Sequence, residues 1–164
     1  MAEPEVISHW YQLIDGLQYS TKDFYEELGK EVESWNIPKG TMLKVEHSEG
    51  SAIFSPKRLY FRVQRDDLIF DICGAEFGRG FFVSWWLVMP PGCLMTLATL
   101  PGIGLLFRPF MKRFTYYRID TQLMFQDVVH AAVLKVLDDL IKVNNLKELT
   151  VEQRKPIMKE FFKR

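Results

Sequence analysis

Two residue types that commonly support covalent catalysis occur in this chain, a cysteine and a histidine. Cys93 and His130 could form a thiolate–imidazole pair, in which the imidazole takes the thiol proton. Asp127 or Asp138 could then orient the ring. The spacing of these residues gives this arrangement no support. The other cysteine, Cys73, lies in an apolar run where we expect an inert, packed thiol. We therefore name no catalytic residue.

A glycine-rich stretch is the second candidate for chemistry. Gly74, Gly78 and Gly80 could bring the backbone close to a phosphate group. Phosphate loops of this kind lead into a helix, whose N-terminus carries partial positive charge. Here residues 81–88 follow, and their composition is that of a strand. We therefore expect a hairpin loop over 74–80, in which glycines take up positive φ.

The remaining charged residues form no recognisable acid–base or metal site. Adjacent acids such as Asp138 and Asp139 point in different directions on a helix. Lys plus Arg and Asp plus Glu number 21 each, so the formal net charge is zero. A general nucleic-acid binder needs a basic surplus, so we expect no nucleic-acid partner. We expect no cofactor either. The basic residues near the C-terminus are interpreted as a solvated helix face; they are Arg154, Lys155, Lys159, Lys163 and Arg164.

Length and cysteine content predict one cytoplasmic domain. A chain of 164 residues can bury a sizeable core without disulfides or metals. Two cysteines are too few for a disulfide framework or for the usual zinc site. The first residues, Met-Ala-Glu-Pro-Glu, lack the basic and apolar regions of a signal peptide. We expect a single domain over 1–164, cytoplasmic or peripheral at a membrane.

The elements that must position these residues predict an α+β protein. Residues 1–36 are predicted to be helical, because apolar residues recur there at helical spacing. From residue 41 the period changes to two, which is typical of strands. We expect an antiparallel β-meander of about five strands over 41–119, with an apolar insert at 90–110. The runs with strand character are 41–46, 51–54, 59–64, 67–73, 81–88 and 114–119.

Residues 120–164 are predicted to form a helical C-terminal segment. Asp120 or Thr121 caps a helix with an apolar stripe. The stripe consists of Val129, Ala132, Val133, Val136, Leu137, Leu140 and Ile141, and it is widened by Phe125 and Val128. Thr150 and Gln153 have capping-box spacing, and Pro156 divides the tail. Helices at both ends of a meander favour an antiparallel sheet that is covered by helices on one face.

The most unusual feature is residues 81–107, among which no residue is charged. Prolines and glycines interrupt this run at Pro90, Pro91 and Pro101, so one continuous membrane-spanning helix is not expected. Three interpretations remain open. The run is a buried strand followed by an apolar cover of the core. It is an exposed flap that docks a partner or a second copy. Or it inserts shallowly into a membrane surface beside a basic cluster.

We therefore expect a non-catalytic binding or assembly module, in which residues 85–110 bind a protein partner, a second copy or a membrane surface. The driving force would be burial of apolar area, about 25 cal/mol per Å² before ordering costs. The predicted binding residues are Trp85, Trp86, Leu97, Leu100, Leu105, Phe107, Arg108, Phe110, Lys112 and Arg113. The alternative is an apolar-ligand binder or enzyme, with a pocket between the sheet and the C-terminal helix.

Overall fold

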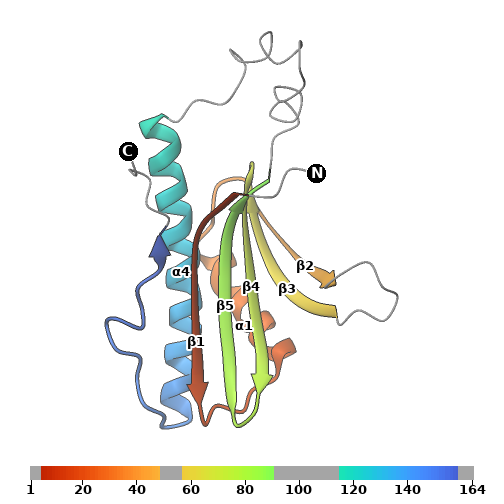
Figure 1. Cartoon of the computed structure of the whole chain (residues 1–164), viewed down its shortest axis with the longest axis vertical. Coiled ribbons are helices and arrows are strands. Elements are labelled where there is room, and N and C mark those ends of the chain that lie inside the picture. The colour runs from red at the N-terminus through yellow and green to blue at the C-terminus, as the bar shows by residue number, and fades with distance from the viewer. Residues whose placement is uncertain (1–4, 49–56, 91–114, 159–164) are drawn as a thin grey trace.

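A six-stranded antiparallel sheet and two helices make up the part of the chain that the computed structural model describes, residues 5–48, 57–90 and 115–158. The strand order in the sheet is β2-β3-β4-β5-β1-β6 (Figure 1). The strands are β1 (Glu5–Asp15), β2 (Gly40–Ser48), β3 (Lys57–Arg65), β4 (Leu68–Phe77), β5 (Gly80–Met89) and β6 (Ile157–Met158). The helices are α1 (Thr21–Ser34) and α4 (Tyr116–Val143). The predicted α+β class, a meander covered by helices, is confirmed.

The meander runs from β2 to β5, with each strand pairing to the next. Its four strands include the predicted runs at 41–46, 59–64, 67–73 and 81–88. The expected glycine loop at 74–80 shrinks to a tight turn between β4 and β5, where Gly78 has the predicted positive φ of 61°. The predicted strand at 51–54 lies outside the described residues, as do residues 91–110 of the apolar insert.

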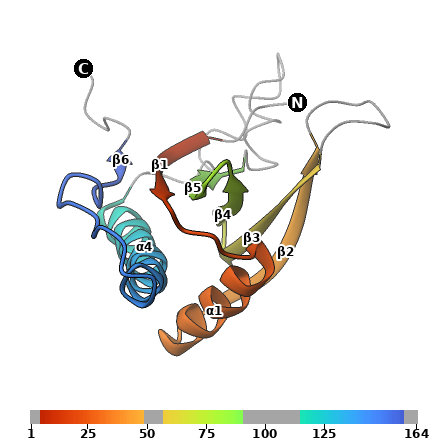
Figure 2. The same ribbon diagram turned by 90° about the horizontal axis from the view of Figure 1, so that it is seen from below.

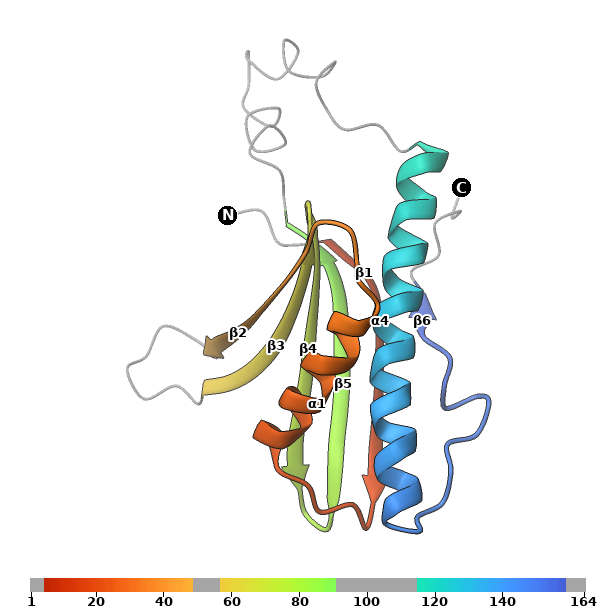
Figure 3. The ribbon, with the colours of Figure 1, turned by 180° about the vertical axis from the view of Figure 1, so that it is seen from behind.

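Both helices pack on one face of the sheet (Figures 2 and 3). Ser20 caps α1, because its hydroxyl accepts hydrogen bonds from the backbone N–H groups of Lys22 and Asp23. On α4, the seven residues of the predicted apolar stripe and Phe125 are buried, whereas Val128 is half-buried. Phe125 of that stripe meets Phe70 and lies under the sheet. The core therefore lies between the sheet and the two helices.

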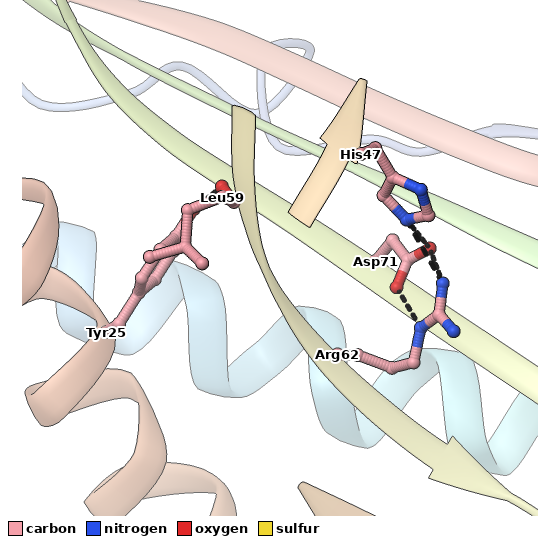
Figure 4. Close-up of polar contacts among 5 residues, drawn as sticks. All are labelled: Tyr25, His47, Leu59, Arg62 and Asp71. Atoms are coloured by element: carbon pink, nitrogen blue, oxygen red, sulfur yellow. Dashed lines mark hydrogen bonds and ion pairs between the residues drawn. The ribbon is translucent and has the colours of Figure 1, made fainter. Parts of the chain in front are cut away.

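Gly74 lets α1 approach the sheet closely. A Cβ at this position would stand 2.6 Å from Cδ1 of Phe24, far inside van der Waals contact. The backbone N–H of Gly74 also donates to the Tyr25 hydroxyl at 3.0 Å. That hydroxyl donates in turn to the carbonyl oxygen of Leu59 at 2.7 Å (Figure 4). The glycine that suggested a phosphate loop is thus a packing residue.

The N-terminal segment corrects the sequence prediction, because residues 5–15 form strand β1 and not a helix. Ile7, Trp10 and Ile14 have helical spacing, yet all three are buried on a strand. Trp10 and Ile14 follow the alternation of a strand, whereas Ile7 does not. A register irregularity between Val6 and Ser8 allows the Ile7 side chain to face the core as well. Ten register pairs with β5 outweigh the local helical pattern. Of the residues predicted to be helical, 21–34 do form a helix, α1.

The strand expected at 114–119 is also wrong, because α4 begins at Tyr116. The Thr115 hydroxyl caps the helix by accepting a hydrogen bond from the Arg118 backbone N–H. The Arg118 side chain forms an ion pair with Asp67, at the turn between β3 and β4. The cap and this ion pair set the start of the helix earlier than the predicted Asp120 or Thr121.

The chain after α4 corrects a third prediction, since its described residues contain no further helix. Thr150 and Gln153 do form the reciprocal bonds of a capping box, but only a turn follows. Beyond Pro156 the chain enters β6, where Met158 and Ile157 lie opposite Ser8 and His9 of β1. Pro156 directly precedes that pairing and disfavours a helix across this position.

Candidate binding surface

The face of the sheet that points away from both helices carries most of the exposed large side chains in its strands. We call it the outer face. Side chains alternate along a strand, so the neighbours of the buried Trp10, Val83 and Trp85 point outward. From β1 the outer face includes His9, Tyr11 and Leu13; from β3, Tyr60 and Arg62; from β4, Ile69, Asp71, Cys73 and Phe77; from β5, Phe82, Ser84, Trp86 and Val88.

Aromatic rings stack across β1 and β5 on this face. His9 lies opposite Trp86 in register, and their rings stack with centroids 4.7 Å apart and planes 13° apart. Tyr11 and Phe82 form a second, looser stack at 6.4 Å. Tyr11 remains 55% exposed, Leu13 50% and Trp86 41%. The strands thus hold several large apolar side chains in fixed positions while leaving about half of each in contact with solvent.

The outer face also carries an ion pair between Arg62 of β3 and Asp71 of β4 (Figure 4). Arg62 binds Asp71 in bidentate fashion, with Nε to Oδ1 and Nη2 to Oδ2 both at 2.7 Å. Asp71 raises the pKa of the Arg62 guanidinium through these hydrogen bonds. Asp71 lies opposite Trp86 in the sheet register, so the pair borders the exposed indole. The two side chains carry opposite charges, so the pair has no net charge, and it lies among apolar side chains.

His47 of β2 completes this polar group. Its Nε2 lies 3.2 Å from Nη2 of Arg62 and 3.5 Å from Oδ2 of Asp71. A neutral His47 can accept a hydrogen bond from the guanidinium at Nε2, and a protonated one can face the carboxylate. Arg62 donates one hydrogen bond to each oxygen of Asp71, so the guanidinium neutralises this carboxylate.

The candidate nucleophile and base take other roles. Cys73 is 1% exposed, and burial raises the pKa of its thiol, which disfavours the reactive thiolate. Both ring nitrogens of His130 are engaged in the core, by the indole N–H of Trp85 and the carbonyl oxygen of Arg154. Asp138 forms a bidentate pair with Arg154 and does not contact the His130 ring. Cys93 lies outside the described residues.

The structure separates the two adjacent tryptophans among the predicted binding residues. Trp85 is completely buried against α4, so its side chain belongs to the core and not to a surface. Trp86 points to the opposite face and is exposed. The other predicted binding residues, Leu97, Leu100, Leu105, Phe107, Arg108, Phe110, Lys112 and Arg113, lie outside the described residues. The sequence interpretation missed Tyr11 and Leu13, because a helix was expected over 5–15.

The space between the sheet and α4, where the alternative function needs a pocket, is filled by side chains. Phe70 is in ring contact there with both Trp85 and Phe125, and all three side chains are buried. Two hollows in the described part of the chain lie elsewhere and are open to solvent. One, of about 210 Å³, lies between the end of α1 and β2, near Ile37 and Met42. The other, of about 460 Å³, lies at the start of α4 and is lined by residues that include the Asp67–Arg118 ion pair.

Within residues 5–48, 57–90 and 115–158, no three His, Cys, Asp or Glu side chains come together as metal ligands would. Neither described helix combines the length and apolarity needed to cross a bilayer. Comparison of the chain with protein-family models, with curated proteins and with solved structures found no match. Fold and surface together define an α+β protein whose antiparallel sheet is covered by helices on one face and carries exposed aromatic residues on the other.

Proposed function

We propose that this protein is a non-catalytic binding or assembly module whose outer face docks on another protein. The observation that carries the proposal is the exposure of Trp86, Tyr11 and Leu13 on the same face of two paired strands. Large apolar patches that are exposed on a protein surface usually mark interaction sites. Trp, Tyr and Arg are also the residue types that contribute most binding energy at protein interfaces.

The rigidity of the face supports tight docking. The Trp86 ring is stacked on His9, and the Arg62 side chain is held at both ends of the Asp71 carboxylate. Side chains that are already fixed lose little conformational entropy when a partner binds, and the cost of ordering one free side chain is about 0.5–1.5 kcal/mol. The outer face is thus prepared for a flat partner surface.

A protein fits this face better than a lipid surface does. Arg62 is neutralised by Asp71, and a carboxylate on the face is unfavourable beside anionic headgroups. A protein can instead offer polar groups that complement the Arg62–Asp71 pair while its apolar atoms cover Trp86. The membrane interpretation depended on Arg108, Lys112 and Arg113, which lie outside the described residues.

The test places a photo-crosslinking amino acid, benzoylphenylalanine, at Tyr11 or Leu13 in cells that make the full chain. The matched control carries it at Tyr117, which is 78% exposed on α4. We expect the same discrete protein adduct from Tyr11 and Leu13, none of that adduct from Tyr117, and its loss when Trp86→Lys is added. Adducts only with lipid, or identical adducts from all three positions, would overturn the proposal.

A further inference from the structure

Among the described strands, β2 lies at an edge of the sheet and is hydrogen-bonded to one neighbour, β3. Its ladder with β3 is regular from Gly40–Arg65 to Ser48–Lys57, without a bulge. The strand contains no proline, and it bends away from α1 together with β3 (Figure 3). Proteins usually shorten, bulge or cover such edges, because their free N–H and C=O groups pair with other strands. The opposite edge, β6, is only two residues long.

Two opposite charges lie on one face of β2. Lys44 and Glu46 are two residues apart and both are exposed, so their side chains project from the same side of the strand. Within the described part of the chain, Lys44 contacts no carboxylate. Glu46 reaches Lys57 at 3.6 Å on the exposed surface, which is a weak interaction. Both charges are therefore available to a partner strand.

We infer that β2 pairs antiparallel with β2 of a second copy of this chain, about a two-fold axis at Val45. In this register Lys44 lies opposite Glu46 of the second copy, and Glu46 lies opposite its Lys44. Val45 meets its own counterpart, and Leu43 lies opposite His47. Opposite charges that face each other across an antiparallel pair stabilise it, so the strand is complementary to itself.

The charges select this register over its neighbours. An axis at Lys44 places two lysines opposite each other, and an axis at Glu46 places two glutamates opposite each other. A lone lysine on an edge discourages pairing with foreign strands. In a pair of two β2 strands with this register, Glu46 of one copy compensates the charge of Lys44 of the other. The charges therefore favour pairing with a second copy over pairing with an unrelated strand.

Pairing of this kind joins the two sheets into one. The two-fold axis is perpendicular to the sheet, so both outer faces lie on the same side and the apolar surface doubles in width. The inference uses an edge and not the outer face, and it therefore stands independently of the proposed function.

The first test is a charge swap in the purified full chain, measured by sedimentation equilibrium. We expect the wild-type chain to dimerise, and Lys44→Glu or Glu46→Lys to raise the dimer dissociation constant about 10-fold or more, because each places like charges opposite twice. The double variant, Lys44→Glu with Glu46→Lys, restores opposite charges and should restore the dimer. Circular dichroism checks that each variant is folded. A monomeric wild-type chain, or dimers insensitive to all three variants, would overturn the inference.

A cysteine substitution tests the axis itself. Val45→Cys, in a Cys93→Ser background, should form a disulfide-linked dimer on mild oxidation, because directly opposed Cα atoms lie within disulfide range. Leu43→Cys is the matched control and should link far less, since it faces His47. Equal linking at both positions contradicts the register. Trp86→Lys should leave this dimer intact while abolishing the Tyr11 adduct, and Lys44→Glu should do the reverse, so the two proposals fail separately.

Discussion

The indole N–H of Trp85 donates a hydrogen bond to Nδ1 of His130 at 3.0 Å, in the core between β5 and α4. Nδ1 must therefore carry a lone pair, which leaves the proton on Nε2. Nε2 donates to the carbonyl oxygen of Arg154 at 2.7 Å and so holds the chain after α4 against the helix. The two bonds together require a neutral imidazole.

Stability should fall as the pH drops below about 6.5, because of His130. Burial lowers the pKa of this ring from its ordinary value of 6.5. Above pH 6.5 the His130 ring is neutral in both the folded and the unfolded chain, so its full contribution to the free energy of unfolding is present. At lower pH the unfolded chain binds the proton first, and the folded state loses free energy relative to it. Urea unfolding at pH 7.5 and 5.5 measures the difference.

His130→Gln is the control for this pH effect. It should lower the free energy of unfolding at pH 7.5 by about 1–3 kcal/mol, because a buried hydrogen-bond partner is lost. It should also reduce the fall in stability between pH 7.5 and 5.5, because the variant lacks the buried imidazole whose pKa is lowered. An unchanged pH dependence would show that His130 does not carry it.

Trp85→Ala and Trp86→Ala should differ sharply, because these neighbours lie on opposite faces of β5. Trp85 is fully buried, and we expect its loss to cost about 3–5 kcal/mol in the free energy of unfolding. Trp86 is 41% exposed and stacks only partly on other rings, so its replacement should cost about 1 kcal/mol or less. Chemical denaturation of both variants is the measurement. Equal losses would contradict the assignment of faces.

Gly74→Ala should destabilise the fold by about 1–3 kcal/mol, since its methyl group meets the Phe24 ring at 2.6 Å. Gly29→Ala in α1 is the matched control. A Cβ there stands 3.7 Å from the Phe61 ring, an ordinary contact, and alanine favours a helix over glycine by about 0.5–1 kcal/mol. Gly29→Ala should therefore raise the melting temperature while Gly74→Ala lowers it. A stable Gly74→Ala variant would mean that α1 can shift away from β4.

Elements with a strong local signal could be predicted from the sequence. The stripe from Val129 to Ile141 repeats over several turns, and its burial follows from that period alone. Strands β3, β4 and β5 could likewise be located by their composition and alternation. The adjacent pair Trp85 and Trp86 was recognised as unusual, but the period of two does not say which of them faces the helices.

What the sequence by itself determined was the α+β class, the meander and the apolar face of α4, because their signals lie within short windows of the chain. Only the tertiary structure decided that residues 5–15 form a strand beside β5 and that β6 returns to β1. Strand pairing joins residues far apart in the chain, so local periodicity cannot report it. The outer face depends on that pairing, because Tyr11 and Leu13 reach Trp86 and Phe82 only when β1 lies beside β5.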